Sequence, residues 1–286
     1  MNLFVCIKQV PDSAQIRVHP VTNTIMRQGV PTIVNPYDLF ALEEALRLRD
    51  EYGGSVTVLS MGPPMAEEAL RRALGIGADH AVLITDRRFA GADTLATSYA
   101  LASALTTLGR EQPIDMVLTG KQTIDGDTAQ VGPGIARRLG LEQLTYVAAI
   151  DRVDPLRREI VVRRRSEGGV QVLASRLPCL VSVVEGLNEV RRGAVADVLR
   201  AARAEVVTWS ATEAGVEDPM RCGLRGSPTV VRRVFAPSPR QERAQMVAVT
   251  GKRPSQLADA VLDLVLTQQP KLEAALADGP VRRNRP

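Results

Sequence analysis

Short apolar runs alternate with longer stretches of helical periodicity through the first half of the chain. Apolar runs bounded by turn residues predict buried strands, and apolar residues at helical spacing predict amphipathic helices. The pattern predicts strands at residues 3–10, 55–60, 81–85, 116–119 and 180–184, and helices after Asn35 and at 67–76, 93–108 and 135–139. This alternation is typical of a doubly wound, Rossmann-like α/β fold, a parallel sheet with helices on both faces.

The pattern changes after Gly140. Residues 146–153, 159–165 and 170–174 alternate between apolar and polar positions, which predicts antiparallel strands, with a hairpin turn at Gly168-Gly169. The remainder has a weak hydrophobic rhythm, with a basic helix near 195–203 and a last helix at 255–265. A tail that cannot bury itself usually lies on something else, so we expect an extended C-terminal arm that reaches a partner.

The composition narrows the class of protein. Aromatic residues make up only 3% of the 286, and the apolar mass is Ala, Val and Leu, which suits aliphatic strands under Ala-rich helices. Exposed rings for stacking nucleic-acid bases are scarce, and no basic helix carries interleaved aromatics, so we expect no nucleic-acid partner. The net charge of +4 fits a polyanionic ligand or an acidic partner better.

The cysteine and histidine counts argue against metal and disulfide chemistry. Three well-separated cysteines and two histidines offer no paired spacing for a disulfide framework or a metal cluster. The first apolar run, residues 3–7, is cut by Lys8, so we expect a strand there and neither a signal peptide nor a membrane span. These observations favour a reducing, aqueous compartment, the cytoplasm, and no membrane insertion.

Residues 119–133 form a glycine-rich loop between a predicted strand end and a helix start. In open α/β sheets ligands bind at the carboxyl ends of the strands, and a helix start favours an anion. Gly120, Gly126 and Gly132 let the backbone approach a phosphate, and Thr128 and Gln130 supply further hydrogen bonds. The loop matches neither a Walker loop nor the dinucleotide fingerprint, so a well-capped loop without a ligand is the alternative.

Two carboxylates in this loop need a separate role. Asp125 and Asp127 would repel phosphate directly, and we expect them either to accept from ribose hydroxyls or to clamp the loop through its own N–H groups. The other strand ends, Cys6 to Lys8, Asn35 to Asp38 and Met61-Gly62, are expected at the same rim. Asn35 is also predicted to cap the first helix, with Pro36 at its first position, and Gly62 serves equally well as a simple turn residue.

Five segments carry a resemblance to a known family. The segment Val162-Arg-Arg-Arg-Ser-Glu-Gly-Gly-Val-Gln-Val-Leu-Ala-Ser-Arg-Leu-Pro-Cys-Leu-Val-Ser182 resembles the signature segment of electron-transfer flavoprotein β subunits. Residues 6–10, 35–38 and 120–125 resemble that family's nucleotide-site motifs in the same order, and residues 187–191 resemble the start of its partner-recognition loop. The resemblance spans about residues 1 to 265.

The resemblance implies an electron carrier and not a self-sufficient enzyme. Members pair with an α subunit, carry FAD between the subunits, and pass electrons from dehydrogenases such as acyl-CoA dehydrogenases to an acceptor. The β subunit itself holds AMP in many members and a second FAD, reduced by NADH, in an electron-bifurcating subgroup. Residues 126–133, 92–101 and 223–229 resemble the FAD-binding subgroup, so we favour FAD over AMP. Because the flavin performs the electron transfer, we expect no catalytic residue.

The expected cofactor site combines the loop with the other strand ends. It comprises Cys6, Lys8, Asn35, Pro36, Tyr37, Asp38, Met61, Gly62, Thr94, Thr97, Gly120, Thr123, Ile124, Asp125, Gly126, Asp127, Thr128, Ala129, Gln130, Val131 and Gly132. Thr94 and Thr97 fit a pyrophosphate or plain helix capping, and Ser227 and Thr229 fit a dinucleotide or a turn. Tyr37 fits a flavin edge or ordinary packing.

The expected partner site lies in the recognition loop and the helix after it. Leu187, Val195, Arg200 and Arg203 are its candidate residues, with Val195 as the apolar anchor or, alternatively, as packing for the arm. We divide the chain into a nucleotide- or flavin-binding α/β domain at 1–187, a recognition loop and helix at 188–203, and an arm at 204–286 that packs on the α subunit. The rival functions are a stand-alone adenine-nucleotide-binding enzyme or sensor, and a scaffold subunit that has lost its cofactor.

Overall fold

The computed structural model describes residues 1–12, 17–18, 25–26, 31–230, 246–251, 253–269 and 272. The chain divides into two compact units, residues 1–236 and 237–286. The strands of the first unit are β1 (Asn2–Cys6), β2 (Gln9–Pro11), β3 (Arg17–Val18), β4 (Ile25–Met26), β5 (Thr32–Val34), β6 (Ser55–Met61), β7 (His80–Ile84), β8 (Met116–Gly120), β9 (Glu142–Asp154), β10 (Glu159–Ser166), β11 (Gly169–Arg176), β12 (Cys179–Val183) and β13 (Val207–Trp209).

The helices of the first unit are α1 (Pro36–Tyr52), α2 (Glu67–Ile76), α3 (Thr94–Glu111), α4 (Val131–Leu139) and α5 (Val195–Arg203), with short 3-10 turns η2 (Pro64–Ala66), η3 (Arg87–Phe89) and η4 (Pro219–Arg221). The second unit contains α6 (Pro254–Gln268). None of the α6 residues is buried, and apolar side chains such as Val261 and Leu262 are exposed on it. Among the described residues, no helix has both the length and the apolar character needed to cross a bilayer.

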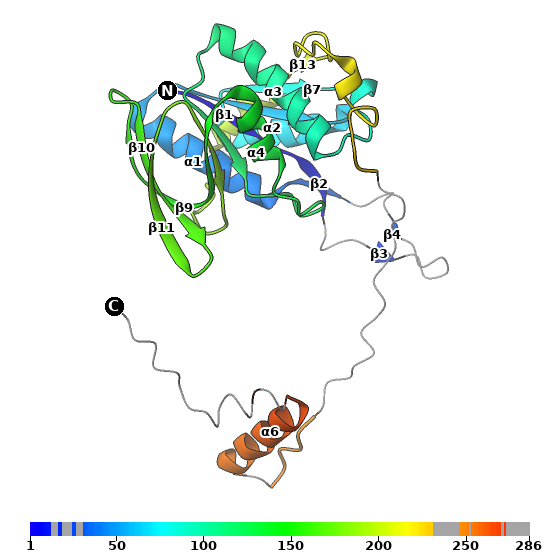
Figure 1. Ribbon diagram of the computed structural model, residues 1–286, viewed down its shortest axis with the longest axis vertical. Coiled ribbons are helices and arrows are strands. Elements are labelled where there is room, and N and C mark those ends of the chain that lie inside the picture. Colours follow the sequence, from blue (N-terminus) through cyan, green and yellow to red (C-terminus); the bar gives the residue numbers. More distant parts are fainter. Residues whose placement is uncertain are drawn as a thin grey trace. The chain divides into compact units, whose positions relative to one another are not determined.

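A sheet forms the centre of the first unit (Figure 1). It has nine strands in the order β11-β10-β9-β12-β8-β1-β6-β7-β13. Every neighbouring pair in the series β9-β12-β8-β1-β6-β7-β13 is parallel, whereas β10 is antiparallel to both β9 and β11. The chain runs outward from β1 through β6 and β7, then crosses to β8 on the other side of β1. The predicted doubly wound sheet with its antiparallel hairpin is confirmed, and the point where the order reverses lies between β1 and β8.

Helices cover both faces of the sheet because each helix buries one aliphatic stripe. One core contains Leu42 and Leu46 of α1 and Leu70 and Leu74 of α2, and α5 packs against the same core. The other core contains residues of α3 and α4, such as Leu105 and Ile135. Truncating one of these fully buried leucines to alanine removes about 2–5 kcal/mol of stability, so both layers hold the strand ends firmly in place.

The expected single strand at residues 3–10 is wrong, since the structure has two strands there. β1 ends at Cys6, and β2 leaves the main sheet to pair with β5. The chain turns because the Lys8 N–H group, which would extend the ladder, donates instead to the Asp38 carboxylate at 2.8 Å. This departure opens the crevice beside the end of β1.

Residues 207–230 belong to the first unit. β13 adds a three-residue edge strand beside β7, and Ala211, Ala214 and Cys222 are buried in the core beneath α3. Three residues are too few for sequence periodicity to predict a strand. The division at 187 and 203, and the packing of residues 204–286 on a partner, stay predictions.

Candidate functional site

A cavity of about 850 Å³ lies at the carboxyl ends of the parallel strands. The ends of β1, β6, β7 and β8 all reach it, and the register places Cys6 level with Leu59 on one side and Thr119 on the other. It is lined by Cys6, Ile7, Lys8, Asp38, Met61, Gly62, Pro63, Pro64, Thr85, Asp86, Arg87, Phe89, Ala90, Gly91, Ala92, Asp93, Thr94, Thr97, Leu101, Thr119, Gly120, Lys121, Gln122, Thr123, Gly126, Thr128, Ala129, Gln130, Val131 and Gly132. The cavity therefore occupies the topological switch point, the usual ligand site of this architecture.

Asp38, near the start of α1, joins the two strands at the switch point. Its carboxylate accepts the Lys8 N–H at 2.8 Å and the Gly120 N–H at 3.2 Å. Gly120 has no room for a side chain, because a Cβ there would lie 2.6 Å from the Asp38 Oδ1 atom. Burial raises the pKa of Asp38 to about 7, although hydrogen bonds from Asn35, Lys8 and Gly120 oppose the rise.

Asn35 fixes the loop and does not cap α1 as predicted. Its side chain makes no cap hydrogen bond. Instead its amide donates to the Gln122 carbonyl at 2.9 Å, and its oxygen accepts the Ile124 N–H at 3.2 Å. Pro36 begins α1, as expected, and needs no donor at that position. The prediction failed because the loop, distant in sequence, offers Asn35 a donor and an acceptor together.

Residues 126–132 present backbone N–H groups to the cavity. Asp127 and Ala129 have positive φ values of 49° and 54°, a backbone shape that turns successive N–H groups toward a concave surface. Within the described residues, the N–H groups of Thr128, Ala129 and Gln130 have no hydrogen-bond partner, and no side chain caps α4. This arrangement suits a phosphate, because helix starts and such turns both bind anions.

A second observation supports a ligand at the same wall. The Thr119 Oγ1 atom is buried and has no hydrogen-bond partner. It lies 2.9 Å from where a Cβ on Gly132 would be, so the absence of a side chain at Gly132 lets the start of α4 approach this hydroxyl closely. The residues present therefore fit a phosphate-bearing cofactor.

The two loop carboxylates act as clamps within the protein. Lys8 Nζ contacts Asp125 Oδ2 at 2.7 Å, and Asp127 accepts from the Gln122 side chain at 2.8 Å. Burial alone would raise the pKa of Asp125, but hydrogen bonds from Lys8 and Thr123 bring it below its ordinary value. Contact of either carboxylate with a ribose stays a prediction.

The start of α3 is already occupied by a carboxylate. Asp93 accepts the N–H groups of Leu95 and Ala96, and its other oxygen accepts the Thr229 hydroxyl at 2.8 Å. The Thr94 hydroxyl donates to Gln130 at 2.8 Å. Helix capping at this point falls to Asp93, not to the threonines, and the negative charge of Asp93 disfavours a phosphate here. Thr97 lines the cavity, and its contact with a pyrophosphate stays a prediction.

Ser227 and Thr229 are held at the rim by Asp93. The Asp93 N–H donates to Ser227 Oγ at 2.8 Å, and both the N–H and the hydroxyl of Thr229 bind the Asp93 carboxylate. Burial alone would raise the pKa of Asp93, but the hydrogen bonds from Ala96, Thr229 and Leu95 outweigh it and lower that pKa. Sequence reasoning missed this carboxylate, although an Asp before a helical run is an N-cap signal.

One side of the cavity is apolar and was also missed. Phe89, which is buried, and Leu101 of α3 form part of it, together with Pro63 and Pro64 after β6. Phe89 lies in η3 after β7 and the prolines follow β6, and no local pattern in the sequence indicates that the two segments line one cavity. An apolar wall of this kind suits a flat ring system.

Tyr37 and Cys6 have restricted roles. Lys121 Nζ lies 4.6 Å from the centre of the Tyr37 ring and 3.0 Å from Glu185. Tyr37 therefore has a cation beside it, and its contact with a flavin stays a prediction. Burial, and secondarily the charge of Asp38, raises the pKa of the Cys6 thiol to about 12, so it is no nucleophile at neutral pH. The described residues contain no group of three or more His, Cys, Asp or Glu that could hold a metal ion.

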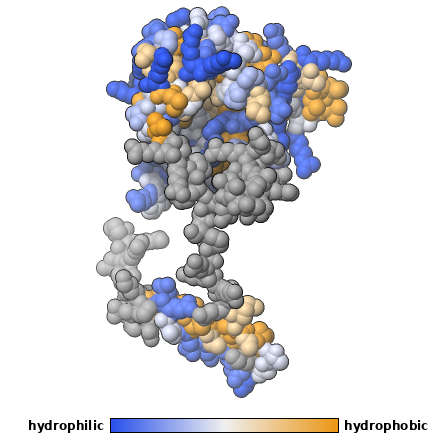
Figure 2. Space-filling view, turned by 90° about the vertical axis from the view of Figure 1, so that its right-hand side faces the viewer, coloured by the Kyte–Doolittle hydropathy of each residue, from blue (hydrophilic) through white to orange (hydrophobic). Residues whose placement is uncertain are grey.

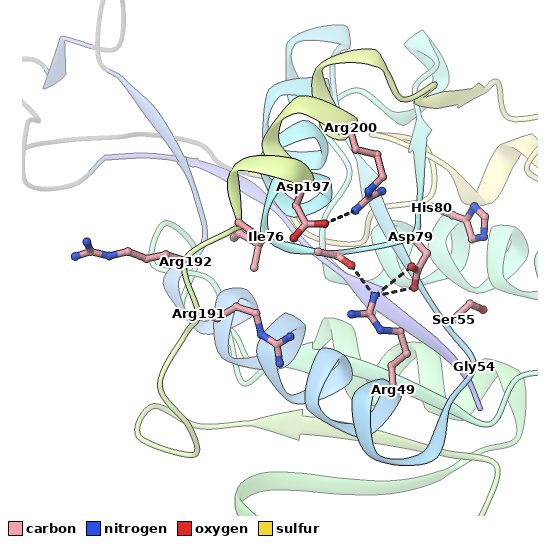
Figure 3. Close-up of a pocket in the computed structure, with 12 residues that line it drawn as sticks. Arg49, Gly54, Ser55, Ile76, Asp79, His80, Arg191, Arg192, Asp197 and Arg200 are labelled. Atoms are coloured by element: carbon pink, nitrogen blue, oxygen red, sulfur yellow. Dashed lines mark hydrogen bonds and ion pairs between the residues drawn. The ribbon is translucent and has the colours of Figure 1, made fainter.

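A second cavity, of about 840 Å³, lies at the opposite edge of the sheet, beside the amino ends of β6 and β7 (Figure 3). Arginines line it, but Arg49 is paired with Asp79, and Arg200 contacts Asp197. Arg192 points away from these pairs. Arg191 is paired with Glu43 and Asp50, so three of the four arginines that line this cavity have acidic partners.

The helix α5 is attached to α2 by a reciprocal pair of arginines. Arg71 of α2 donates to the carbonyls of Ala201 and Ala204 at the end of α5. Arg200 of α5 donates in turn to two carbonyls at the end of α2, those of Leu74 and Ala78. Arg200, predicted to contact a partner, is thus engaged within the chain.

The other predicted partner residues differ in exposure. Val195 has 77% of its surface exposed, and Val198 and Leu199 are exposed beside it. Leu187 is half-buried and packs against the first core, and Arg203 is exposed. The face of the first unit seen in Figure 2 is mostly hydrophilic, with small hydrophobic patches between.

The recognition segment is also fixed to α1. The Arg191 guanidinium and its own N–H bind Glu43, whose side chain is only 5% exposed, and Asn188 donates to Glu44. Because a buried carboxylate is costly without its partner, the segment before α5 is firmly held.

Comparison with known proteins adds independent information. Residues 22–214 match the family model described as "Electron transfer flavoprotein domain". The chain is 69% identical over 283 residues to "Protein FixA" of Azorhizobium caulinodans, covering 98% of this chain and 100% of that protein. It is 48% identical to "Electron transfer flavoprotein subunit beta" of Clostridium acetobutylicum, over 82% and 87% of the two chains. The corresponding protein of Megasphaera elsdenii is 41% identical, over 94% and 99%.

Proposed function

Because the chain belongs to the electron transfer flavoprotein family, as a subunit of the β or FixA type, we propose that it pairs with an α subunit and holds FAD in its own cavity. The observation that carries the proposal is the cavity at the switch point, where unpaired N–H groups face an apolar wall. A cofactor that carries both a phosphate and a flat ring system needs the N–H groups for the phosphate and the apolar wall for the ring. Family membership disfavours the rival reading, a stand-alone nucleotide-binding enzyme or sensor.

The extent of the cavity favours FAD over AMP. The lining extends from residues 126–132 to Phe89 and Leu101, and we infer that a dinucleotide, which has a ring system on each side of its diphosphate, occupies more of it than a mononucleotide does. Since Asp93 occupies the start of α3, we place the diphosphate at the start of α4. Thr97 is then a neighbour of the cofactor and not its main anchor.

The roles of the protein residues follow from this placement. FAD, when bound, supplies the electron-accepting chemistry. The N–H groups after Gly126 hold its phosphates, the apolar wall excludes water, and the Lys8–Asp125 ion pair holds the loop against β1. No proton-transfer residue is assigned, and Cys6 stays protonated.

The electron route is proposed from the family. We infer that the complex exchanges electrons with a flavoprotein dehydrogenase, such as an acyl-CoA dehydrogenase, and that NADH reduces the FAD of this subunit in an electron-bifurcating scheme. The resemblance of residues 92–101 and 223–229 to the FAD-binding subgroup supports this. The three free, buried cysteines suit a reducing compartment such as the cytoplasm.

Counting cofactors tests the proposal. We expect the chain co-expressed with its α subunit to yield a one-to-one complex containing two FAD. Cofactors are released by denaturation and quantified by chromatography against protein concentration. One FAD and one AMP would reject FAD in this cavity while leaving the family role intact. Bleaching of the flavin absorbance by NADH would extend the proposal to bifurcation, and its absence would reject that extension.

Val195→Asp is expected to slow electron exchange with the dehydrogenase by about tenfold or more while leaving flavin content unchanged. An apolar anchor at the centre of an interface dominates affinity, and a charge there must be desolvated. Stopped-flow reduction by the dehydrogenase measures the effect. Arg203→Ala, an exposed change in the same helix, serves as the control and should alter mainly the salt dependence. Loss of the heterodimer would show that Val195 packs the arm instead, and unchanged kinetics would exclude both roles.

A further inference from the structure

Asp38 is a buried carboxyl group in the wall of the cofactor cavity. It is 5% exposed, and its two oxygens accept N–H groups from Lys8 after β1 and from Gly120 at the end of β8. Asp38 therefore lies at the switch point between β1 and β8, where the strand order reverses. The proposed function gives it no role.

No cation neutralises Asp38 within the described residues. From the β1 side, the Lys8 ammonium is turned to Asp125, which it contacts at 2.7 Å, and the Cys6 thiol beside Asp38 is protonated at neutral pH. From the β8 side, Lys121 lies over Tyr37 and binds Glu185. The cost of the buried negative charge is therefore opposed by the neutral donors of Asn35, Lys8 and Gly120 and by the charge of Lys8, which makes no direct ion pair with Asp38.

The phosphate-binding wall is adjacent to Asp38. Gly120, which donates to Asp38, follows Thr119, and the Thr119 hydroxyl lies 2.9 Å from the Cβ position of Gly132 in α4. A phosphate bound at the start of α4 adds a second negative charge close to the carboxylate. A like charge favours the neutral form of a carboxyl group. The raised pKa of Asp38, about 7 without any ligand, means that a modest addition moves its titration across neutral pH.

We propose that binding of the diphosphate cofactor is coupled to the uptake of one proton by Asp38, so that the cavity holds its cofactor more tightly as the pH falls through neutrality. The proton comes from solvent and converts the carboxylate to the acid, with no other bond made or broken. This inference rests on the proposed function, since it requires a phosphate-bearing ligand in the cavity.

The test is calorimetric titration of the cofactor-free full chain with FAD, in two buffers of different ionisation enthalpy at pH 7.5. The difference in measured heat gives the protons taken up, and we expect a substantial fraction of one proton per FAD. The association constant should fall between pH 6 and pH 8, by at most about tenfold per pH unit. FAD is the probe because its bridged diphosphate has no group that titrates near neutrality, whereas the phosphate monoester of AMP does.

Asp38→Asn is expected to abolish the proton uptake and flatten the pH dependence. Asp127→Asn is the matched control, because it removes an exposed carboxylate from the loop that lines the cavity, at a positive-φ position that Asn tolerates. It should keep the pH slope, whatever it does to the affinity itself.

The pH dependence of wild-type stability, measured without ligand, tests the titration of Asp38 without relying on a variant that could fold poorly. Because the folded pKa of Asp38, about 7, lies above the unfolded value of about 3.9, its contribution to stability is complete below pH 4. That contribution is lost as the pH rises to 7. Urea unfolding of the wild type should show this loss. FAD binding without proton uptake by the wild type would overturn the inference and leave the proposed function standing. Failure to bind FAD at all would overturn both.

Discussion

Gly126→Val is expected to deprive the cavity of its cofactor in a chain that still folds. Gly126 lines the cavity, and a Cβ at this position would meet only the Thr123 hydroxyl, at 3.3 Å, so the chain accommodates the substitution with a small shift. The branched side chain would then stand where the phosphate must approach the N–H groups of the loop. Losing two charge-assisted hydrogen bonds costs about 3 kcal/mol or more, equivalent to a loss of affinity of about 100-fold.

Cofactor content and thermal unfolding distinguish this effect from a general loss of structure. The purified complex should lose one FAD of two, and the cofactor-free variant chain should keep the melting temperature of the cofactor-free wild-type chain. Gly109→Val is the matched control, since Gly109 lies in α3 away from the cavity with Ile114 at 3.4 Å. It should keep both flavins. Full flavin content in Gly126→Val would place the phosphates elsewhere.

Gly193→Val is expected to detach α5 from α2. A Cβ on Gly193 would lie 1.7 Å from the Gly75 carbonyl oxygen, a backbone atom that cannot move aside alone. The segment before α5 must shift, and overpacking of this kind lowers the unfolding free energy by about 1–3 kcal/mol. The same shift would displace Val195 and Leu199, so partner binding should fall together with stability.

Gly75→Ala tests the same contact from the other side. A Cβ on Gly75 would meet Ala201 Cβ at 3.8 Å, ordinary van der Waals contact. Replacing a helical glycine should raise the unfolding free energy by about 0.5–1 kcal/mol. Urea unfolding and hydrogen exchange in α5 measure both variants. Equal effects of the two substitutions would show that the close approach of the two backbones has no energetic importance.

The sequence predicted the sheet and the location of the cavity because both follow from local patterns and a topological rule. Strand–helix alternation is local, and the ends of parallel strands meet at one edge whatever the side chains are. The expectation that residues 120–132 hold a phosphate rested on glycine spacing between a strand end and a helix start, and it stays a prediction. The paired strands β9–β11 followed equally from alternation.

The contacts that were not predicted join residues far apart in the sequence. Asp93 binds Thr229, and Asn35 serves the loop at Gln122 and not its own helix. Arg200 binds the carbonyl of Leu74, a contact that its spacing did not predict. A polar side chain has several possible partners, and the choice is made by the folded chain, so composition and spacing do not reveal it. The three-residue strand β13 was missed for lack of length.

The reciprocal arginines of α2 and α5 have a consequence for the kinetics of association. Each guanidinium holds the carbonyls at the end of the other helix, so α5 is ordered before any partner approaches. A segment that orders only on binding loses conformational entropy at that moment and associates with lower affinity for the area it buries. Here that loss occurs during folding. The encounter is then a docking of preformed surfaces, whose rate depends on orientation and charge and not on the formation of a helix.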